Sequence, residues 1–131
     1  MMLHDGLTEK ILKTCFQVSN ELGSGFVESV YEKALLIALQ DEEVAAEAQA
    51  PLIVRFREQK IGQFFADLLV ENEVIVELKA VKSLAPEHIA QLINYLKASG
   101  KQVGLLVNFG NPRIEYRRIN NRVESHKNKK V

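Results

Sequence analysis

Residues 66–79 constrain the fold of this chain more than any other segment. Two apolar runs flank the polar triplet Glu71-Asn72-Glu73, a pattern that predicts two antiparallel strands joined by a short turn. Three ionisable residues interrupt these runs: Asp67, Glu77 and Lys79. Residues two apart on a strand share a face, so Glu77 and Lys79 point the same way, and the turn returns Asp67 beside them. Because an unpaired charge is costly to desolvate, we expect these side chains to pair, bind a metal or take part in chemistry.

Spacing alone leaves two interpretations of this triplet open. In the first, Asp67 and Glu77 hold a divalent cation near the Leu78 carbonyl, and the Lys79 ammonium orients an attacking water or neutralises developing charge. In the second, Glu77 and Lys79 form an ordinary solvent-facing ion pair, and Asp67 caps a turn.

The rest of the chain predicts an α/β fold. Helical spacing of apolar residues predicts helices over residues 8–22, with Thr8 as N-cap, over 28–40 and over 86–99. Alternating or continuous apolar runs predict strands over residues 44–49, 52–57, 61–70, 74–81, 103–109 and 113–119. We therefore expect a mixed sheet of about five strands flanked by helices, in the order helix, helix, three or four strands, helix, strand, strand.

Length and charge indicate one domain with a basic end. The 131 residues carry 17 basic and 17 acidic side chains, and we expect a single domain over residues 1–119 with a basic polar tail over 120–131. Residues 113–131 contain seven basic and two acidic residues, a net charge of +5. This end is either a solvated terminus or a phosphate-binding segment. The candidate phosphate ligands are Arg113, Arg117 and Arg118.

The compartment follows from cysteine usage and hydropathy. Cys15 is the only cysteine, so an internal disulfide is impossible, and its apolar neighbours predict a core position. The first five residues do not resemble a signal peptide, and no apolar run is long enough to span a membrane. We expect a cytoplasmic protein that does not contact a membrane.

Two further residue pairs lie at helical spacing. Glu28 and Tyr31 are one turn apart at the start of the second predicted helix, and Gln91 and Tyr95 are four apart on the third. Each pair has an ordinary explanation: Glu28 complements the helix dipole, Tyr95 is partly buried with its hydroxyl outward, and Gln91 is a surface residue. Their joint occurrence with the charged hairpin is harder to explain in this way.

Together these residues resemble a known group of proteins. Asp67 followed by Glu77-Leu78-Lys79 resembles the signature of the PD-(D/E)xK nuclease superfamily, with Ala66 where the signature has proline. The stretch Gly25-Phe26-Val27-Glu28-Ser29-Val30-Tyr31 is similar to the motif of the GxxExxY proteins, which are grouped with that superfamily. Other matching stretches are Asn20-Glu21-Leu22-Gly23, Gln91-Leu92-Ile93-Asn94-Tyr95-Leu96 and Gly104-Leu105-Leu106-Val107-Asn108-Phe109-Gly110.

The resemblance implies a fold and a set of roles. It implies a restriction-endonuclease-like core, with Asp67, Glu77 and Glu28 around Mg²⁺ or Mn²⁺ and Lys79 placing the water. Gln91 would complete the catalytic set, and Tyr31 and Tyr95 would support it.

Two classes of function remain open. The first is a metal-dependent nuclease that hydrolyses nucleic-acid phosphodiester bonds, with DNA as the expected substrate and a homodimer or partner protein as a possible assembly. The second is a non-catalytic nucleic-acid-binding or assembly module that retains the nuclease fold. Hydrolysis of a small phosphoester is a third, weaker alternative, because the same ligands serve that chemistry.

Overall fold

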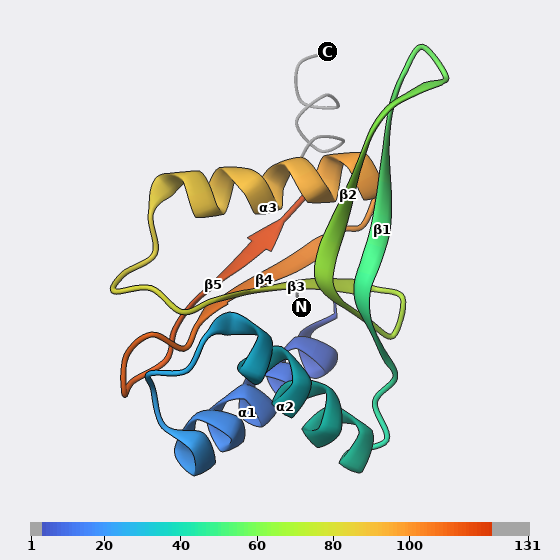
Figure 1. The fold of residues 1–131 in the computed structure, drawn as a ribbon. Coiled ribbons are helices and arrows are strands. Elements are labelled where there is room, and N and C mark those ends of the chain that lie inside the picture. The colour runs from blue at the N-terminus through green and yellow to red at the C-terminus, as the bar shows by residue number, and fades with distance from the viewer. Residues whose placement is uncertain (1–3, 122–131) are drawn as a thin grey trace.

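The computed structural model describes residues 4–121 and shows one five-stranded sheet with helices on both faces (Figure 1). Helices α1 (Asp5–Leu22) and α2 (Glu28–Asp41) cover one face, and α3 (Pro86–Ser99) covers the other. The strands lie side by side in sequence order: β1 (Ala46–Phe56), β2 (Gln59–Val70), β3 (Val74–Lys79), β4 (Val103–Asn108) and β5 (Glu115–Asn120). The predicted mixed sheet flanked by helices is therefore confirmed, as is the predicted order of the elements.

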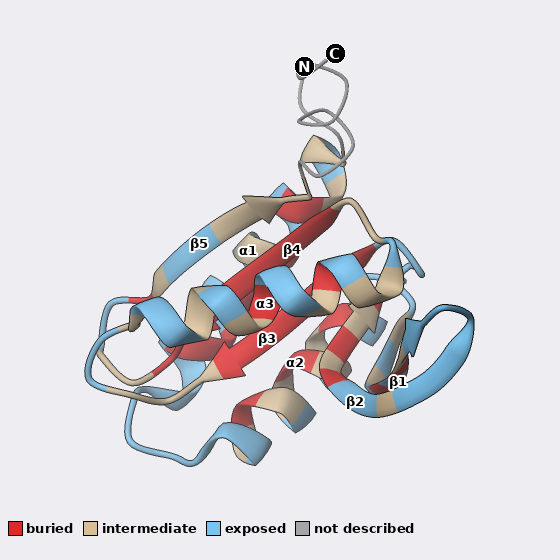
Figure 2. Ribbon diagram, turned by 90° about the horizontal axis from the view of Figure 1, so that it is seen from above, coloured by how far each residue is buried: buried red, intermediate tan, exposed pale blue. Residues whose placement is uncertain are grey.

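Strand direction follows from the connections. Strands β1, β2 and β3 form the predicted antiparallel meander, and β3 pairs in parallel with β4. Helix α3 makes the crossover that a parallel pair requires. Strand β5 then pairs antiparallel with β4 at the edge of the sheet. Figure 2 shows β3 and β4 buried along their length beneath α3, which explains why both are almost continuously apolar.

Several predicted boundaries were wrong. Helix α1 begins at Asp5, and the Thr8 hydroxyl donates to the Asp5 carbonyl from inside the first turn instead of capping it. The two strands predicted on either side of residue 50 form the single strand β1, which contains Pro51. An edge strand tolerates proline because only one of its sides joins the ladder.

Strand β1 changes face at Gln49, which has a left-handed φ of 53°. Ala48 packs with the core under α1 and α2, whereas Ala50 packs with the core under α3. Residues two apart on a regular strand would share one face, so the backbone bends at Gln49. The ladder pairs Ala48 with Leu68 and Ala50 with Ala66, which leaves Asp67 opposite the bend. Beyond it, the β1–β2 ribbon extends away from the body of the domain (Figure 1).

Buried Asn108 holds the segment that follows β3. Its Oδ1 accepts hydrogen bonds from the backbone N–H groups of Val81 and Gly110, each at 2.9 Å. Its Nδ2 donates to the Val81 carbonyl at 2.9 Å and to Glu115 at 3.2 Å. A Cβ on Gly110 would lie 1.9 Å from the Val81 carbonyl oxygen, so only glycine allows this approach. The end of β3, which carries Lys79, is thereby tied to the end of β4.

Three further expectations concern Cys15, membrane-spanning helices and the basic tail. Cys15 is fully buried, as predicted, and burial raises the pKa of its thiol to about 12. Within residues 4–121, no helix is both long and apolar enough to cross a membrane. The expected basic tail over residues 120–131 lies outside the described residues, apart from Asn120 and Asn121.

Candidate active site

Asp67 and Glu77 lie opposite each other across β2 and β3. The ladder ends at the pair Leu68–Val76, and Asp67 and Glu77 are the next residues of the two strands beyond that pair. The Asp67 N–H donates to Glu77 Oε2 at 2.7 Å, and the Leu78 N–H donates to Asp67 Oδ2 at 2.8 Å. One oxygen of each carboxylate is therefore held by backbone of the neighbouring strand. The other oxygen of each accepts no hydrogen bond from residues 4–121.

Glu77 is a buried carboxylate, with 4% of its surface exposed. Burial raises its pKa from 4.5 to about 8, and the negative charge of Asp67 adds to the rise. The Asp67 N–H and the Lys79 ammonium lower the pKa, and the Glu28 carboxylate raises it slightly. The site thus disfavours a negative charge on Glu77, and a bound cation would stabilise that charge.

Lys79 lies on the same face of β3 as Glu77, as predicted. Its Nζ donates to Oε1 of Gln91 at 3.1 Å, which ties the strand to α3. Among residues 4–121, Lys79 forms no close ion pair with a carboxylate. The alternative of a solvent-facing Glu77–Lys79 ion pair is therefore wrong: Glu77 is buried, and the amine is held by an amide.

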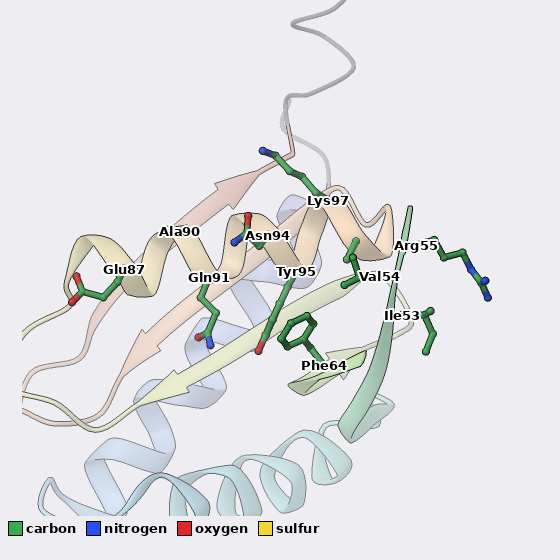
Figure 3. Close-up of a pocket in the computed structure, with 11 residues that line it drawn as sticks. Ile53, Val54, Arg55, Phe64, Glu87, Ala90, Gln91, Asn94, Tyr95 and Lys97 are labelled. Atoms are coloured by element: carbon green, nitrogen blue, oxygen red, sulfur yellow. The ribbon is translucent and has the colours of Figure 1, made fainter. Parts of the chain in front are cut away.

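Tyr95 and Gln91 reach the site from α3. Figure 3 shows both side chains leaving the helix in the same direction, toward β3. Burial raises the pKa of the Tyr95 hydroxyl, and the charges of Glu77 and Asp67 raise it further. The structure therefore brings together five of the predicted residues: Asp67, Glu77, Lys79, Gln91 and Tyr95.

Tyr31 is placed away from the carboxylates. It is fully buried and stacks on Phe109, with ring centroids 4.5 Å apart. Its hydroxyl donates to the Gly23 carbonyl at 2.6 Å and accepts from the Phe26 N–H at 3.3 Å. Tyr31 therefore anchors the loop that leads into α2, and through this loop it fixes where Glu28 begins the helix.

Glu28 is exposed at the first residue of α2. Its charge acts on Glu77, yet no three Asp, Glu, His or Cys side chains of residues 4–121 converge as metal ligands. The structure therefore pairs Asp67 with Glu77 but does not bring the Glu28 carboxylate into direct contact with them.

Glu32, which the sequence patterns did not single out, also lies near the site. Burial raises the pKa of its carboxyl group, the hydrogen bond from Gln49 lowers it, and the charge of Asp67 raises it. Gln49 Nε2 donates to Glu32 Oε1 at 2.8 Å, so the bend in β1 places this carboxylate near the site. Glu28 and Glu32 are four apart on one helix, and this spacing was the available signal.

The three candidate arginines do not converge. Arg118 donates to the Thr8 hydroxyl and lies 3.4 Å from Asp5, on the side of the sheet covered by α1. Arg117 is its neighbour on β5, so it points to the opposite face, and it is exposed. Arg113 is exposed in the loop before β5.

Comparison with known proteins agrees with this fold. The family model described as the PD-(D/E)XK nuclease superfamily matches residues 5–119, so the chain belongs to that superfamily. A solved structure titled "Crystal structure of SSO0001" superposes with a TM-score of 0.57 and 22% identity, over 76% of this chain and 52% of that one. The chain therefore spans about half the length of that structure, and the likeness shows a shared fold. Curated proteins yield no match.

The superfamily domain is consistent with a nuclease-type function in general. PD-(D/E)XK nucleases generally use divalent metals.

Proposed function

We propose that this protein is a metal-dependent nuclease that activates water at Asp67, Glu77 and Lys79 to hydrolyse phosphodiester bonds. The observation that carries the proposal is the pair of hydrogen bonds that link Asp67 to Glu77 and Leu78. These bonds hold two carboxylates side by side, each with one oxygen free of hydrogen bonds from residues 4–121. The amine of Lys79 lies on the same face of β3.

The donor set fits Mg²⁺ or Mn²⁺. Mg²⁺ commonly takes one or two carboxylates and completes its octahedron with waters and substrate phosphate, so two acids are sufficient. Asp67 and Glu77 would hold the ion, and exposed Glu28 would act through a water. When bound, the ion would polarise the scissile phosphate and lower the pKa of a bound water.

The protein's own groups would then orient the reaction. Gln91 holds the Lys79 amine at 3.1 Å, and this contact would aim the ammonium at the attacking water or at charge developing on the phosphate. The Tyr95 hydroxyl, four residues further along α3, would bind a non-bridging phosphate oxygen. Glu77 would exchange its proton for the metal, since its pKa of about 8 lies near neutral pH.

The proposal extends to the family, the substrate and the compartment. We infer membership of the GxxExxY proteins from residues 25–31, where Tyr31 anchors the loop before Glu28. We propose DNA as the substrate. We propose the cytoplasm as the compartment, since the only cysteine cannot form an internal disulfide. A homodimer would place two such sites on a duplex.

A cleavage panel tests the proposed activity. Linear, circular, single-stranded and branched DNA, together with RNA, would be incubated with Mg²⁺ or Mn²⁺, with Glu77→Ala as the control. We expect the wild type to cut at least one of these substrates. None of three variants should cut it: Asp67→Ala, Glu77→Ala and Lys79→Ala. Equal cleavage by the wild type and all three folded variants would refute the assignment.

A non-catalytic nucleic-acid-binding module is the second candidate. The lack of a third converging acid among residues 4–121 favours it. Calorimetry separates the two functions: a nuclease binds Mg²⁺ or Mn²⁺ in the wild type and loses that binding in Asp67→Ala, whereas a module would show no metal binding.

A further inference from the structure

A groove of about 830 Å³ opens between α3 and the β1–β2 ribbon. Figure 3 shows the side chains that line it, including Val54 and Phe64 from the ribbon and Gln91 and Tyr95 from α3. Gln91 also accepts the hydrogen bond from Lys79, so the groove adjoins the candidate active site. A ligand in this groove would therefore lie next to that site.

The groove presents an aromatic pair to solvent. The rings of Phe64 and Tyr95 lie 5.8 Å apart at 37°, and 48% of Phe64 is exposed. The exposed Phe64 ring beside half-buried Tyr95 offers a surface for base stacking, which contributes substantially to the binding of unpaired nucleotides and tolerates any sequence.

The charges of the groove are arranged along its length. Lys97 and Arg55 lie at one end, and Glu87 lies at the other, near the start of α3. Lys97 follows Gln91 by six residues, which is about 9 Å along a helix. Figure 3 shows Lys97 leaving α3 in the opposite direction from Gln91 and Tyr95, and Arg55 on the side of β1 away from Val54, so both charges lie outside the inner face of the groove.

We propose that this groove binds a single-stranded segment of the substrate, with one unpaired base stacked on the Phe64–Tyr95 pair. The phosphate on one side of that base faces Gln91 and the site, and the strand continues along α3 toward the other end of the groove. The inference rests on the proposed function for its substrate class. It selects single strands because a paired base in a duplex is covered on both faces by its neighbours and cannot stack on a side chain.

Binding can be tested without cleavage, in metal-free Glu77→Gln protein. A fluorescein-labelled oligonucleotide would report affinity by anisotropy, and a 2-aminopurine base in the same strand would report stacking by quenching. Phe64→Ala is the test variant, and Phe65→Ala is its matched control. Phe65 is the next residue of β2, is 49% exposed, and points to the opposite face of the ribbon.

We expect tighter binding of the single strand than of the duplex, with quenching of 2-aminopurine. Phe64→Ala should weaken single-strand binding about tenfold and abolish the quenching, whereas Phe65→Ala should change neither by more than about twofold. Equal effects of the two variants, or equal affinity for single strand and duplex without quenching, would overturn the proposal. So would a Phe64→Ala protein that changes from dimer to monomer in sedimentation and binds the single strand normally, because the groove would then hold a second copy.

These results are independent of the cleavage panel. An inactive wild type that shows the Phe64-dependent stacking would refute the nuclease and retain the groove. A wild type that cleaves nucleic acid but shows no Phe64-dependent stacking would retain the nuclease and refute the groove.

Discussion

Asp67 and Glu77 hold each other in place: the Asp67 N–H donates to Glu77 Oε2 at 2.7 Å, just beyond the end of the β2–β3 ladder. The Leu78 N–H returns a bond to the Asp67 carboxylate at 2.8 Å. The position of each acid therefore depends on the strand that carries the other. Because both acids belong to one hairpin, their geometry is largely independent of the helices that cover the sheet.

Glu77 should make the stability of the metal-free protein depend on pH. Its pKa is raised from 4.5 to about 8, so between these values the folded protein keeps a proton that the unfolded chain releases. The free energy of unfolding should therefore fall as pH rises through this window, by up to about 1.4 kcal/mol per pH unit. Glu77→Gln removes this contribution. As pH rises through the window, the free energy of unfolding of Glu77→Gln should therefore increase relative to that of the wild type.

Urea denaturation in EDTA at the two ends of this window measures the effect. Glu42→Gln, at an exposed acid, is the matched control and should follow the wild type. Parallel pH profiles for wild type and Glu77→Gln would contradict the raised pKa.

Mg²⁺ binding should release protons at neutral pH. A metal ligand must be deprotonated, and Glu77 in the folded metal-free protein holds its proton up to about pH 8. Calorimetry in two buffers of different ionisation enthalpy should give close to one proton released per ion at pH 7, and weaker binding at lower pH. Binding that releases no proton would place the metal elsewhere.

Tyr31→Phe should destabilise the protein by about 1 kcal/mol, because the Gly23 carbonyl and the Phe26 N–H lose a shared partner. Thermal unfolding measures this change. Tyr116→Phe is the control, since this tyrosine is exposed on β5. Equal stability of the two variants would mean that the Tyr31 hydroxyl does not hold the loop.

Gly110→Ala should cost about 3 kcal/mol, because its Cβ would overlap the Val81 carbonyl and force apart the segment that follows Lys79. Gly6→Ala provides the contrast: a Cβ there meets no atom within 4 Å, and alanine favours helix α1, so stability should rise by up to about 1 kcal/mol. Chemical denaturation of both variants tests the pair. A tolerated Gly110→Ala would show that the close approach at Val81 is not required.

The sequence predicted the elements that obey a simple period. The two-residue repeat of β3 placed Glu77 with Lys79, and the four-residue spacing on α3 placed Gln91 with Tyr95, because each rule acts within one element. The short turn between β2 and β3 was enough to place Asp67 as well.

The features that the sequence did not predict depend on contacts between distant elements or on unusual backbone. Glu32 is held near Asp67 by Gln49, which adopts a left-handed φ and bends β1. The residue type of Gln49 does not predict this conformation. Arg118 bonds to Thr8, 110 residues earlier in the chain, so no local pattern could show that it faces α1. Pro51 lies between the two strands predicted over residues 44–49 and 52–57, but the edge position of β1 accommodates it within one strand.

The most direct test of the central claim is the rate of Mg²⁺-dependent cleavage of the substrate that the wild type cuts best. Asp67→Asn and Lys79→Met should each lower this rate by at least about 100-fold, with unchanged circular dichroism. Lys82→Met, at an exposed lysine three residues after Lys79, should leave it within about twofold. Cleavage that persists in Asp67→Asn and Lys79→Met, or falls equally in Lys82→Met, would contradict a nuclease site at this hairpin.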